Sequence, residues 1–320
     1  MMGREVLVIQ NRDIYGLNIS PLECVKWVDE SFRLKALAQL PPKMSVHPQG
    51  NDFFTSMPCC LPSSYGVFGM KVVHRILGAT PSLGSEILLY DSKSGQLQAL
   101  IDGDWITTMR TGAVAALIQH LQRTNTDTYS FMGLGNTARA TALCLLSIFS
   151  DKKLKFRLLR YKTQAESFIE RFKEVNNVSF EIVDTIDHLV SGADVLISCI
   201  TDAQNLICEN NELYRKGLLL VPIHTRGFQN CDLFFDKVYG DDTGHVSGFR
   251  YFDRFKEFDE FGNILIGKNR GRENDEQRIV VYNIGLGLHD VVFAYKIHCL
   301  LKNTVSTSFI LDKEDEKFWI

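Results

Sequence analysis

Six residues near the middle of the chain have a spacing suited to holding a phosphate. They match the pattern G-x-G-x-x-G/A, follow the apolar run TYSFM, and open a helix-like stretch. The first glycine permits a tight turn, the second lets a pyrophosphate approach the backbone, and the alanine allows close packing of helix on strand. The N–H groups at such a helix start favour anions. The pattern predicts a dinucleotide site made by Gly133, Gly135, Asn136, Thr137 and Ala138.

The end of the next predicted strand carries cations where an acidic residue is usual. A carboxylate at this point normally binds the ribose hydroxyls of NAD. Here the segment reads LLRYKT and supplies Arg160, Lys162 and Thr163 instead. These groups can pair with a 2′-phosphate, which favours NADP over NAD. The alternative, that they are solvated surface charges, leaves NAD open.

Three further cations lie at positions where packing of the hydrophobic core does not explain a charged side chain. Lys43 follows two prolines, Lys71 lies in the strand-like run GMKVV, and Arg110 lies in a helix-like run. Thr107 and Thr111 share the helix face of Arg110 at spacings of three and one residues. Convergence of the three cations would grip a carboxylate. The alternative is a set of ordinary surface charges.

The elements that must position these residues fall into two groups. Up to about residue 123, a helix from Pro21, strands near residues 53–57, 66–74 and 86–90, and a helix from Asp104 indicate one α+β domain. From Thr128 onward, strands and helices alternate, which is typical of a doubly wound parallel sheet. A last helix, with His289 and Asp290 expected as caps, is predicted to return to the first domain.

Composition excludes several classes of protein. The chain has 320 residues and a net charge of -3, which is unsuited to general nucleic-acid binding. No apolar run reaches 18 residues and no signal peptide is evident, so we expect no membrane span and a cytoplasmic protein. The eight cysteines and eight histidines form no metal-binding pattern, so no metal is expected.

Several short motifs, taken in order, resemble the ornithine cyclodeaminase/mu-crystallin family along essentially the whole chain. They are PPK at 41–43, SMP at 56–58, GMK at 69–71, the stretch from 86 to 111, GLGNTA, and NIGLGLHD near the end. The resemblance implies an α/β fold with a Rossmann domain at 124–285. It also implies a discontinuous substrate and dimerisation domain at 1–123 plus 286–320, and a homodimer.

The resemblance also implies roles for single residues. Lys43 stands where the family usually has an arginine that grips the substrate carboxylate, and Lys71 and Arg110 match the rest of that clamp. Ser82 matches a threonine on the substrate side. The positions that match dinucleotide contacts are Thr111, Thr201, Ile284 and Gly285.

One departure from the family pattern changes the expected chemistry. The cyclodeaminase branch has a catalytic aspartate in the loop that here reads HTRGF, and Arg226 takes its place. Arginine stays protonated and cannot act as a base. Asp232, Asp241 or Asp242 could substitute if the loop is rebuilt. An arginine here resembles the branch that oxidises an N-(aminocarboxyethyl)-glutamate in siderophore assembly, where it could bind a second carboxylate.

These features predict an NAD(P)-dependent oxidoreductase that acts on the C–N bond of a small amino or imino carboxylate. Lys71, Arg226 and His224 are the candidate catalytic residues, with His224 as a proton carrier. Three alternatives remain open. They are a deaminating cyclodeaminase with recycled NAD, a non-catalytic binder of NADPH and a small acid like mu-crystallin, and an activity like that of alanine dehydrogenase.

Overall fold

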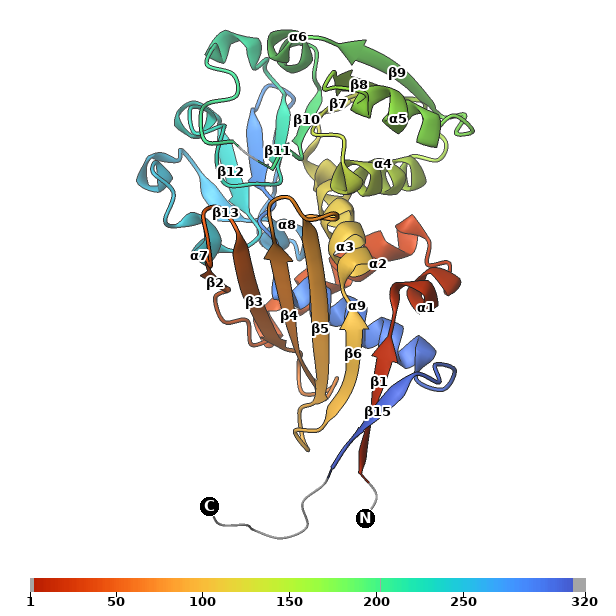
Figure 1. The fold of residues 1–320 in the computed structure, drawn as a ribbon. Helices are drawn as coiled ribbons and strands as arrows, with labels where there is room; N and C mark the ends of the chain where they lie inside the picture. The colour runs from red at the N-terminus through yellow and green to blue at the C-terminus, as the bar shows by residue number, and fades with distance from the viewer. Residues whose placement is uncertain (1–2, 202, 313–320) are drawn as a thin grey trace. The chain divides into compact units, whose positions relative to one another are not determined.

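The computed structural model describes residues 3–201 and 203–312 (Figure 1). The chain divides into two compact units. Unit 1 comprises the described parts of Met1–Ser20, Leu34–Thr107 and Leu286–Ile320. Unit 2 comprises Pro21–Arg33 and the described parts of Thr108–Gly285. The domain boundaries expected from the sequence, 1–123 plus 286–320 and 124–285, remain a prediction about which segments fold together.

Unit 1 is built on a seven-stranded sheet in the order β15-β1-β6-β5-β4-β3-β2. Only β1 and β6 are parallel neighbours among its described strands, and the other pairs are antiparallel. The strands alternate buried and more exposed residues, as expected for a sheet with one face on the core. Their bounds are β1 Arg4–Ile9, β2 Met44–Val46, β3 Phe53–Cys60, β4 Val67–Arg75, β5 Leu83–Asp91, β6 Leu97–Asp102 and β15 Ser308–Leu311.

Helix α9 (Gly287–Leu301) covers one face of this sheet and contacts β3, β4 and β5 (Figure 1). Two glycines let it approach closely. A Cβ at Gly69 of β4 would lie 2.7 Å from the side chain of Val291, and one at Gly287 would lie 2.9 Å from the carbonyl oxygen of Met57. The predicted return of the last helix to the first domain is therefore confirmed. The short helix α1 (Asn11–Gly16) and the 3-10 turn η1 (Lys35–Leu37) complete the helical part of this unit.

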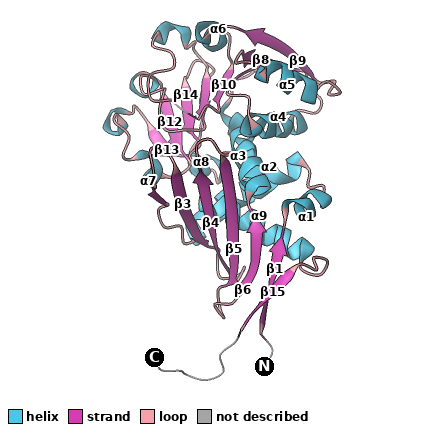
Figure 2. Cartoon of the chain, in the orientation of Figure 1, coloured by secondary structure: helices cyan, strands magenta, loops and turns pink. Residues whose placement is uncertain are grey.

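Unit 2 is built on an eight-stranded parallel sheet in the order β13-β12-β14-β11-β10-β7-β8-β9. Strand order reverses between β7 and β10, which is the switch point of a Rossmann fold. The strands are β7 Thr128–Met132, β8 Leu154–Leu159, β9 Val178–Val183, β10 Val195–Ser198, β11 Leu219–Pro222, β12 Lys237–Gly240, β13 Phe258–Glu260 and β14 Ile279–Tyr282. Figure 2 shows these strands flanked by helices.

The helices of unit 2 follow the strands in alternation. They are α2 Pro21–Leu34, α4 Asn136–Ile148, α5 Gln164–Arg171, α6 Ile186–Ser191, α7 Thr243–Val246 and α8 Phe261–Leu265. The 3-10 turns are η2 Ile118–Leu121, η3 Asn211–Leu213, η4 Cys231–Leu233 and η5 Phe252–Arg254. Helix α3 (Asp104–Leu117) begins in unit 1 and continues into unit 2.

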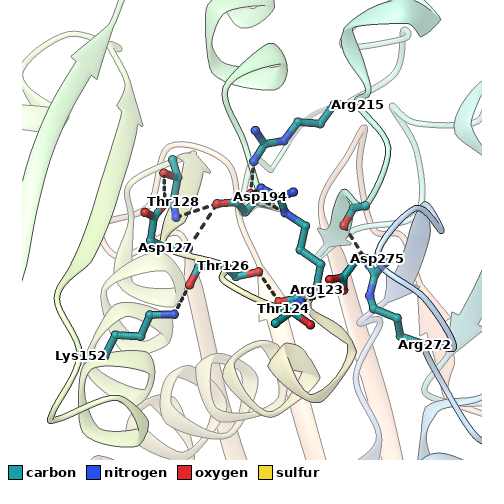
Figure 3. Close-up of polar contacts among 11 residues, drawn as sticks. Arg123, Thr124, Thr126, Asp127, Thr128, Lys152, Asp194, Arg215, Arg272 and Asp275 are labelled. Carbon is teal, nitrogen blue, oxygen red and sulfur yellow. Dashed lines mark hydrogen bonds and ion pairs between the residues drawn. The ribbon is translucent and has the colours of Figure 1, made fainter.

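A buried carboxylate ties together the ends of strands at the edge of the sheet where β7 and β10 begin. Asp194 accepts hydrogen bonds from the backbone N–H groups of Asp127 and Thr128 at 3.2 and 3.1 Å. Arg123 pairs with it at 2.5 Å, and Arg215 also pairs with it (Figure 3). Burial raises the pKa of Asp194, but these donors lower it by more, so the net pKa is below the ordinary value.

The predicted fold class, a Rossmann domain with a discontinuous α+β domain, is confirmed. Helix α2 begins at Pro21, as predicted, and ends at Leu34. Some elements differ from the prediction. Strands β14 and β15 are among the elements that were not expected, and each joins a sheet. Each has only four residues, which is too short to show a periodic pattern.

Candidate functional site

The turn after β7 has the shape that its glycines predict. Gly133 has φ +76°, and a Cβ there would lie 2.7 Å from backbone atoms of Cys199. Because both the conformation and the space exclude a side chain, only glycine fits. A Cβ at Gly135 would meet nothing within 4 Å, so this backbone borders open space. Ala138 is fully buried, as close packing of the helix requires.

Helix α4 begins at this turn and has open N–H groups at its start. Gly135 is its N-cap, with no side-chain cap. Gly135 and Asn136 are exposed and Thr137 is partly exposed. A phosphate could therefore meet both the bare backbone and the positive end of the helix dipole. These residues fit the pyrophosphate of a nicotinamide dinucleotide.

The cations after β8 are exposed, but one of them already has acidic partners. Arg160 donates to Asp184 at 2.7 Å and to Glu166 at 2.6 Å. These hydrogen bonds, that of Asp184 first, raise the pKa of Arg160. Lys162 has φ +51° and lies over the ring of Tyr161. A 2′-phosphate would have to share Arg160 with two carboxylates.

Strands β10 and β11 end in a hydrogen-bonded pair. The Nε2 atom of His224 lies 2.6 Å from the hydroxyl of Ser198, and its Nδ1 atom lies 2.6 Å from the carbonyl oxygen of Arg226. Since that carbonyl can only accept, Nδ1 carries a proton, and in the neutral ring Nε2 accepts from Ser198. The ring also stacks on Phe228. Ser198 is a residue that the sequence did not single out.

The surroundings of His224 favour its neutral form. Burial lowers the pKa of His224, although the bond to the Arg226 carbonyl opposes this. The Arg226 side chain is exposed in the same loop. Thr201 lies exposed just beyond β10. The structure thus brings His224 and Arg226 into one loop beside the strand ends of the switch point.

A second turn, at Ile284 and Gly285, is held by a buried aspartate. Asp241 follows β12 and accepts from the Ile284 N–H at 2.9 Å and from the Gly285 N–H. Its other oxygen lies 3.1 Å from Nδ1 of His245. A Cβ at Gly285, where φ is +99°, would lie 2.7 Å from the guanidinium of Arg110. The Arg110 guanidinium therefore lies directly against this turn. The role of Asp241 in holding the turn was not predicted from the sequence.

Thr111 belongs to the same surroundings. Its carbonyl oxygen accepts from the side chain of Asn283 at 3.2 Å. Since Asn283 immediately precedes the turn, this bond ties α3 to the segment carrying Ile284 and Gly285. Three of the predicted cofactor contacts, Thr111, Ile284 and Gly285, are thus adjacent within unit 2.

In unit 1, the strand register can be extended from β2 to relate the two predicted clamp lysines. Lys71 pairs with Met57, and Met44 pairs with Ser56. Continuing that register by one residue places Lys43 beside Met57. The backbones of the two lysines are then about 10 Å apart, two strand spacings, and their side chains share one face. Convergence with Arg110 stays a prediction, because Arg110 belongs to unit 2.

The ammonium of Lys71 is held inside unit 1. It forms an ion pair with Asp290 at 2.8 Å, and neither side chain has any exposure. It also donates to the hydroxyl of Thr107 at 3.4 Å. The expectation that His289 and Asp290 cap the last helix is wrong for both residues. The N-cap is Leu286, no side chain caps the helix, and Asp290 points to Lys71.

The structure separates Ser82 from Lys71. Ser82 lies beyond the last pair of the β4–β5 hairpin, Arg75 with Leu83, whereas Lys71 pairs with Ile87. Ser85 is the nearer serine. Its hydroxyl lies 2.9 Å from that of Thr107, and its N–H donates to Asp104 at 2.7 Å. The sequence did offer a signal for Ser85. It lies two residues before Ile87 on a half-buried strand, so the two side chains share one face.

None of the three aspartates considered as replacements for the missing base is a free carboxylate at the loop. Asp232 is fully buried and accepts from the hydroxyl of Tyr282 at 2.6 Å. Asp242 caps α7 by accepting from the Gly244 N–H at 2.8 Å. Asp241 holds the Ile284 turn. Each therefore has a structural partner.

Two features are absent from the described residues, 3–201 and 203–312. No helix there combines the length and apolarity needed to cross a bilayer. No group of three or more histidine, cysteine or acidic side chains there is placed to hold a metal ion.

Comparisons with known proteins support the resemblance. Alanine dehydrogenase of Archaeoglobus fulgidus is 25% identical in an alignment that covers 94% of this chain and 98% of that protein. N-((2S)-2-amino-2-carboxyethyl)-L-glutamate dehydrogenase of Staphylococcus aureus is 22% identical, with coverage of 93% and 96%. The structure of Thermococcus litoralis Δ1-pyrroline-2-carboxylate reductase with NADH and L-proline superposes with a TM-score of 0.81 at 21% identity, covering 94% of this chain and 99% of that one.

A family profile decides the assignment. Residues 4–304 match the ornithine cyclodeaminase/mu-crystallin family. This match spans both units, including the glycine turn of unit 2 and the predicted clamp lysines, Lys43 and Lys71, of unit 1. The chain belongs to the ornithine cyclodeaminase/mu-crystallin family.

Proposed function

We propose that this chain is a nicotinamide-dinucleotide-dependent oxidoreductase that acts on the C–N bond of a small amino or imino carboxylate. The observation that carries the proposal is the bare glycine turn at the switch point of the parallel sheet. Ligands of open parallel sheets bind at this point. The related proteins are reductases and dehydrogenases of amino and imino acids, which supports the same class of reaction.

The cofactor would lie across the ends of β7 and β10. Gly133, Gly135, Asn136, Thr137 and Ala138 would hold its pyrophosphate. Arg160, Lys162 and Thr163 would lie beside the adenosine ribose, and Thr111, Thr201, Ile284 and Gly285 would line the nicotinamide end. When bound, a nicotinamide dinucleotide supplies or takes up a hydride. Asp241 fixes the Ile284–Gly285 turn through two N–H groups, so the site is preorganised.

We propose NADP as the preferred form, with NAD also accepted. The segment that carries Arg160, Lys162 and Thr163 contains no carboxylate that could bind the ribose hydroxyls. The pairing of Arg160 with Asp184 and Glu166 weakens this preference, because both anions compete with a phosphate. We therefore expect a modest preference of about tenfold, corresponding to about 1.4 kcal/mol.

The substrate would be fixed by its α-carboxylate. Lys43, Lys71 and Arg110 are the proposed clamp. The resemblance adds Ser82 at the substrate side, although the register places Ser85 nearer to Lys71. Fixing the carboxylate orients the α-carbon for hydride transfer, and orientation supplies much of the rate. Reduction of an imine also consumes one proton at nitrogen, and oxidation of an amine releases one. His224 is the proposed carrier, exchanging its proton through the Ser198 hydroxyl.

Arg226 would bind a second acid group on the substrate. Arg226 is exposed and its carbonyl oxygen contacts Nδ1 of His224. The resemblance implies that Arg226 stands where the cyclodeaminase branch has a base. A permanently charged guanidinium suits a carboxylate and cannot take a proton. This favours an opine-like secondary amine, or its imine, with two carboxylates. We also propose a homodimer located in the cytoplasm.

Absorbance at 340 nm tests the proposal. Purified protein is given NADPH or NADH with mixtures of 2-oxo acids and amines, and the reverse reaction is tried with dicarboxylate secondary amines. We expect turnover with a dicarboxylate, and a loss of at least tenfold in kcat/KM in Arg226→Ala for that substrate but not for a monocarboxylate.

Other outcomes identify the alternatives. Proline formed from ornithine without net NADH would indicate a cyclodeaminase. Ammonia-dependent reduction of pyruvate would indicate an alanine dehydrogenase activity. Tight cofactor binding without any turnover would indicate a binding protein.

A further inference from the structure

The ion pair between Lys71 and Asp290 joins the sheet of unit 1 to helix α9. The two side chains meet at 2.8 Å and neither has any exposure. We propose that Asp290 is a positioning residue that acts through Lys71, by fixing the direction of the ammonium that meets the substrate. This inference rests on the proposed function, in which Lys71 contacts the substrate carboxylate.

The packing of α9 brings Asp290 within reach. Gly69 and Lys71 are two residues apart on β4, so they share one face. A Cβ at Gly69 would lie only 2.7 Å from Val291, the residue after Asp290. The missing side chain at Gly69 therefore lets the helix lie close enough for Asp290 to reach Lys71. At the helix start, Gly287 makes a similar close approach to Met57, the residue that pairs with Lys71.

Stability alone gives no reason for this pair. A buried ion pair can often be replaced by apolar residues of similar size without loss of stability, whereas removal of one partner costs about 3–5 kcal/mol. Ile87, which pairs with Lys71, and Val291, which follows Asp290, are both fully buried and apolar. The pair is therefore better explained by what the ammonium does than by what it adds to the fold.

Two bonds contribute to the orientation of the ammonium. One runs to Asp290 and the other to the hydroxyl of Thr107. Thr107 is itself fixed by Ser85, whose N–H donates to Asp104. Because these partners come from α9, α3 and β5, the Nζ atom is fixed from several sides. Loss of Asp290 removes the charged one of these two bonds.

A double-mutant cycle on kcat/KM tests whether Asp290 acts through Lys71. We expect Asp290→Asn to lower kcat/KM for the imino acid about 100-fold, since a displacement near 1 Å can cost that much. In the Lys71→Met background the same change should cost less than about threefold, because the group it positions is gone. An equal loss in both backgrounds would overturn the proposal. Glu5→Gln, an exposed charge removal on β1, is the control and should leave kcat/KM within twofold of the unmodified protein.

A second variant serves if Asp290→Asn fails to fold. Lys71→Met with Asp290→Leu replaces the pair by apolar residues and should fold. It should bind NADH like the unmodified protein but lose turnover about as far as Lys71→Met. Full turnover in this variant would show that the pair is only structural.

Binding of L-proline to the NADH-loaded protein, followed by calorimetry, separates the two proposals. If the unmodified protein turns over no imino or amino acid, the proposed function fails. The role of Asp290 is then judged by binding alone. A Kd for L-proline weakened at least tenfold by Asp290→Asn supports it, and an unchanged Kd overturns it.

Discussion

The buried carboxyl of Asp232 makes the stability of unit 2 depend on pH. Its side chain is fully buried, one oxygen accepts from Tyr282 at 2.6 Å, and the other has no hydrogen-bond partner among the described residues. Burial raises the pKa of Asp232 from 3.8 to about 7, and the Tyr282 bond opposes this only partly. The folded state therefore holds a proton that the unfolded state releases near pH 4.

The sign and size of the pH dependence follow from the difference between the folded and the unfolded pKa of Asp232. A group whose pKa is raised by folding adds stability below its unfolded pKa, and this stability is lost as the pH rises through the folded pKa. For Asp232 that loss spans the range from about pH 4 to about pH 7. One pKa unit corresponds to about 1.4 kcal/mol, so between pH 5 and pH 8 this group removes about 3 kcal/mol.

Asp232→Asn removes the ionisable group and keeps its size. The amide oxygen can still accept from Tyr282, but the amide nitrogen is buried, at a cost of about 1–3 kcal/mol that does not vary with pH. Because the unmodified protein has already lost about 1.6 kcal/mol at pH 5 and about 4.4 kcal/mol at pH 8, we expect the variant to be about as stable as the unmodified protein at pH 5 and more stable at pH 8. Urea unfolding at pH 5, 6, 7 and 8 measures the difference.

Asp253→Asn is the matched control, because this aspartate is exposed in a neighbouring 3-10 turn. It should leave the pH dependence of the free energy of unfolding unchanged. If Asp232→Asn and the unmodified protein keep parallel pH profiles, to within about 1 kcal/mol, the reasoning about Asp232 is refuted.

Three further predictions concern the dinucleotide site and the strand edge opposite to it. Asp194→Ala leaves two arginines without their carboxylate and should lower the free energy of unfolding by about 3–5 kcal/mol, measured by urea unfolding; a loss below 1 kcal/mol would contradict this. Gly135→Ala should leave the melting temperature within about 2 °C but weaken NADPH binding at least tenfold, whereas Gly133→Ala should lower stability as well, because its φ is +76°. Wild-type binding by Gly135→Ala would refute the phosphate site. Arg160→Ala with Lys162→Ala should weaken NADPH binding about tenfold and NADH binding less than twofold, as followed by fluorescence; equal weakening would exclude a contact with the 2′-phosphate.

Local patterns in the sequence were enough to predict the Rossmann unit. The alternation of strands and helices and the glycine turn from 133 to 138 are short-range signals, and the structure confirms the fold they predict. The expected proximity of Lys43 and Lys71 on the sheet of unit 1 depends instead on strand register. The pairs of Met44 with Ser56 and of Met57 with Lys71, from which the proximity of Lys43 and Lys71 is inferred, form only after three strands pair.

The residues that were missed depend on contacts between distant segments. Asp290 stands at a helix start, where aspartate usually caps, but the glycine at 69 lets it reach a strand more than 200 positions earlier. Ser85 rather than Ser82 faces Thr107, and a difference of three positions in a strand decides which serine lies near Lys71. Such choices follow from tertiary packing, which a single sequence does not display.

Transfer of deuterium tests the central claim most directly. The protein is incubated with nicotinamide cofactor deuterated at C4 and an imino carboxylate, and the product is analysed by mass spectrometry. We predict one deuterium at the α-carbon of the amino acid, with one oxidised cofactor formed per product. A product without deuterium, formed without net oxidation of the cofactor, would contradict the proposed reduction of the C–N bond.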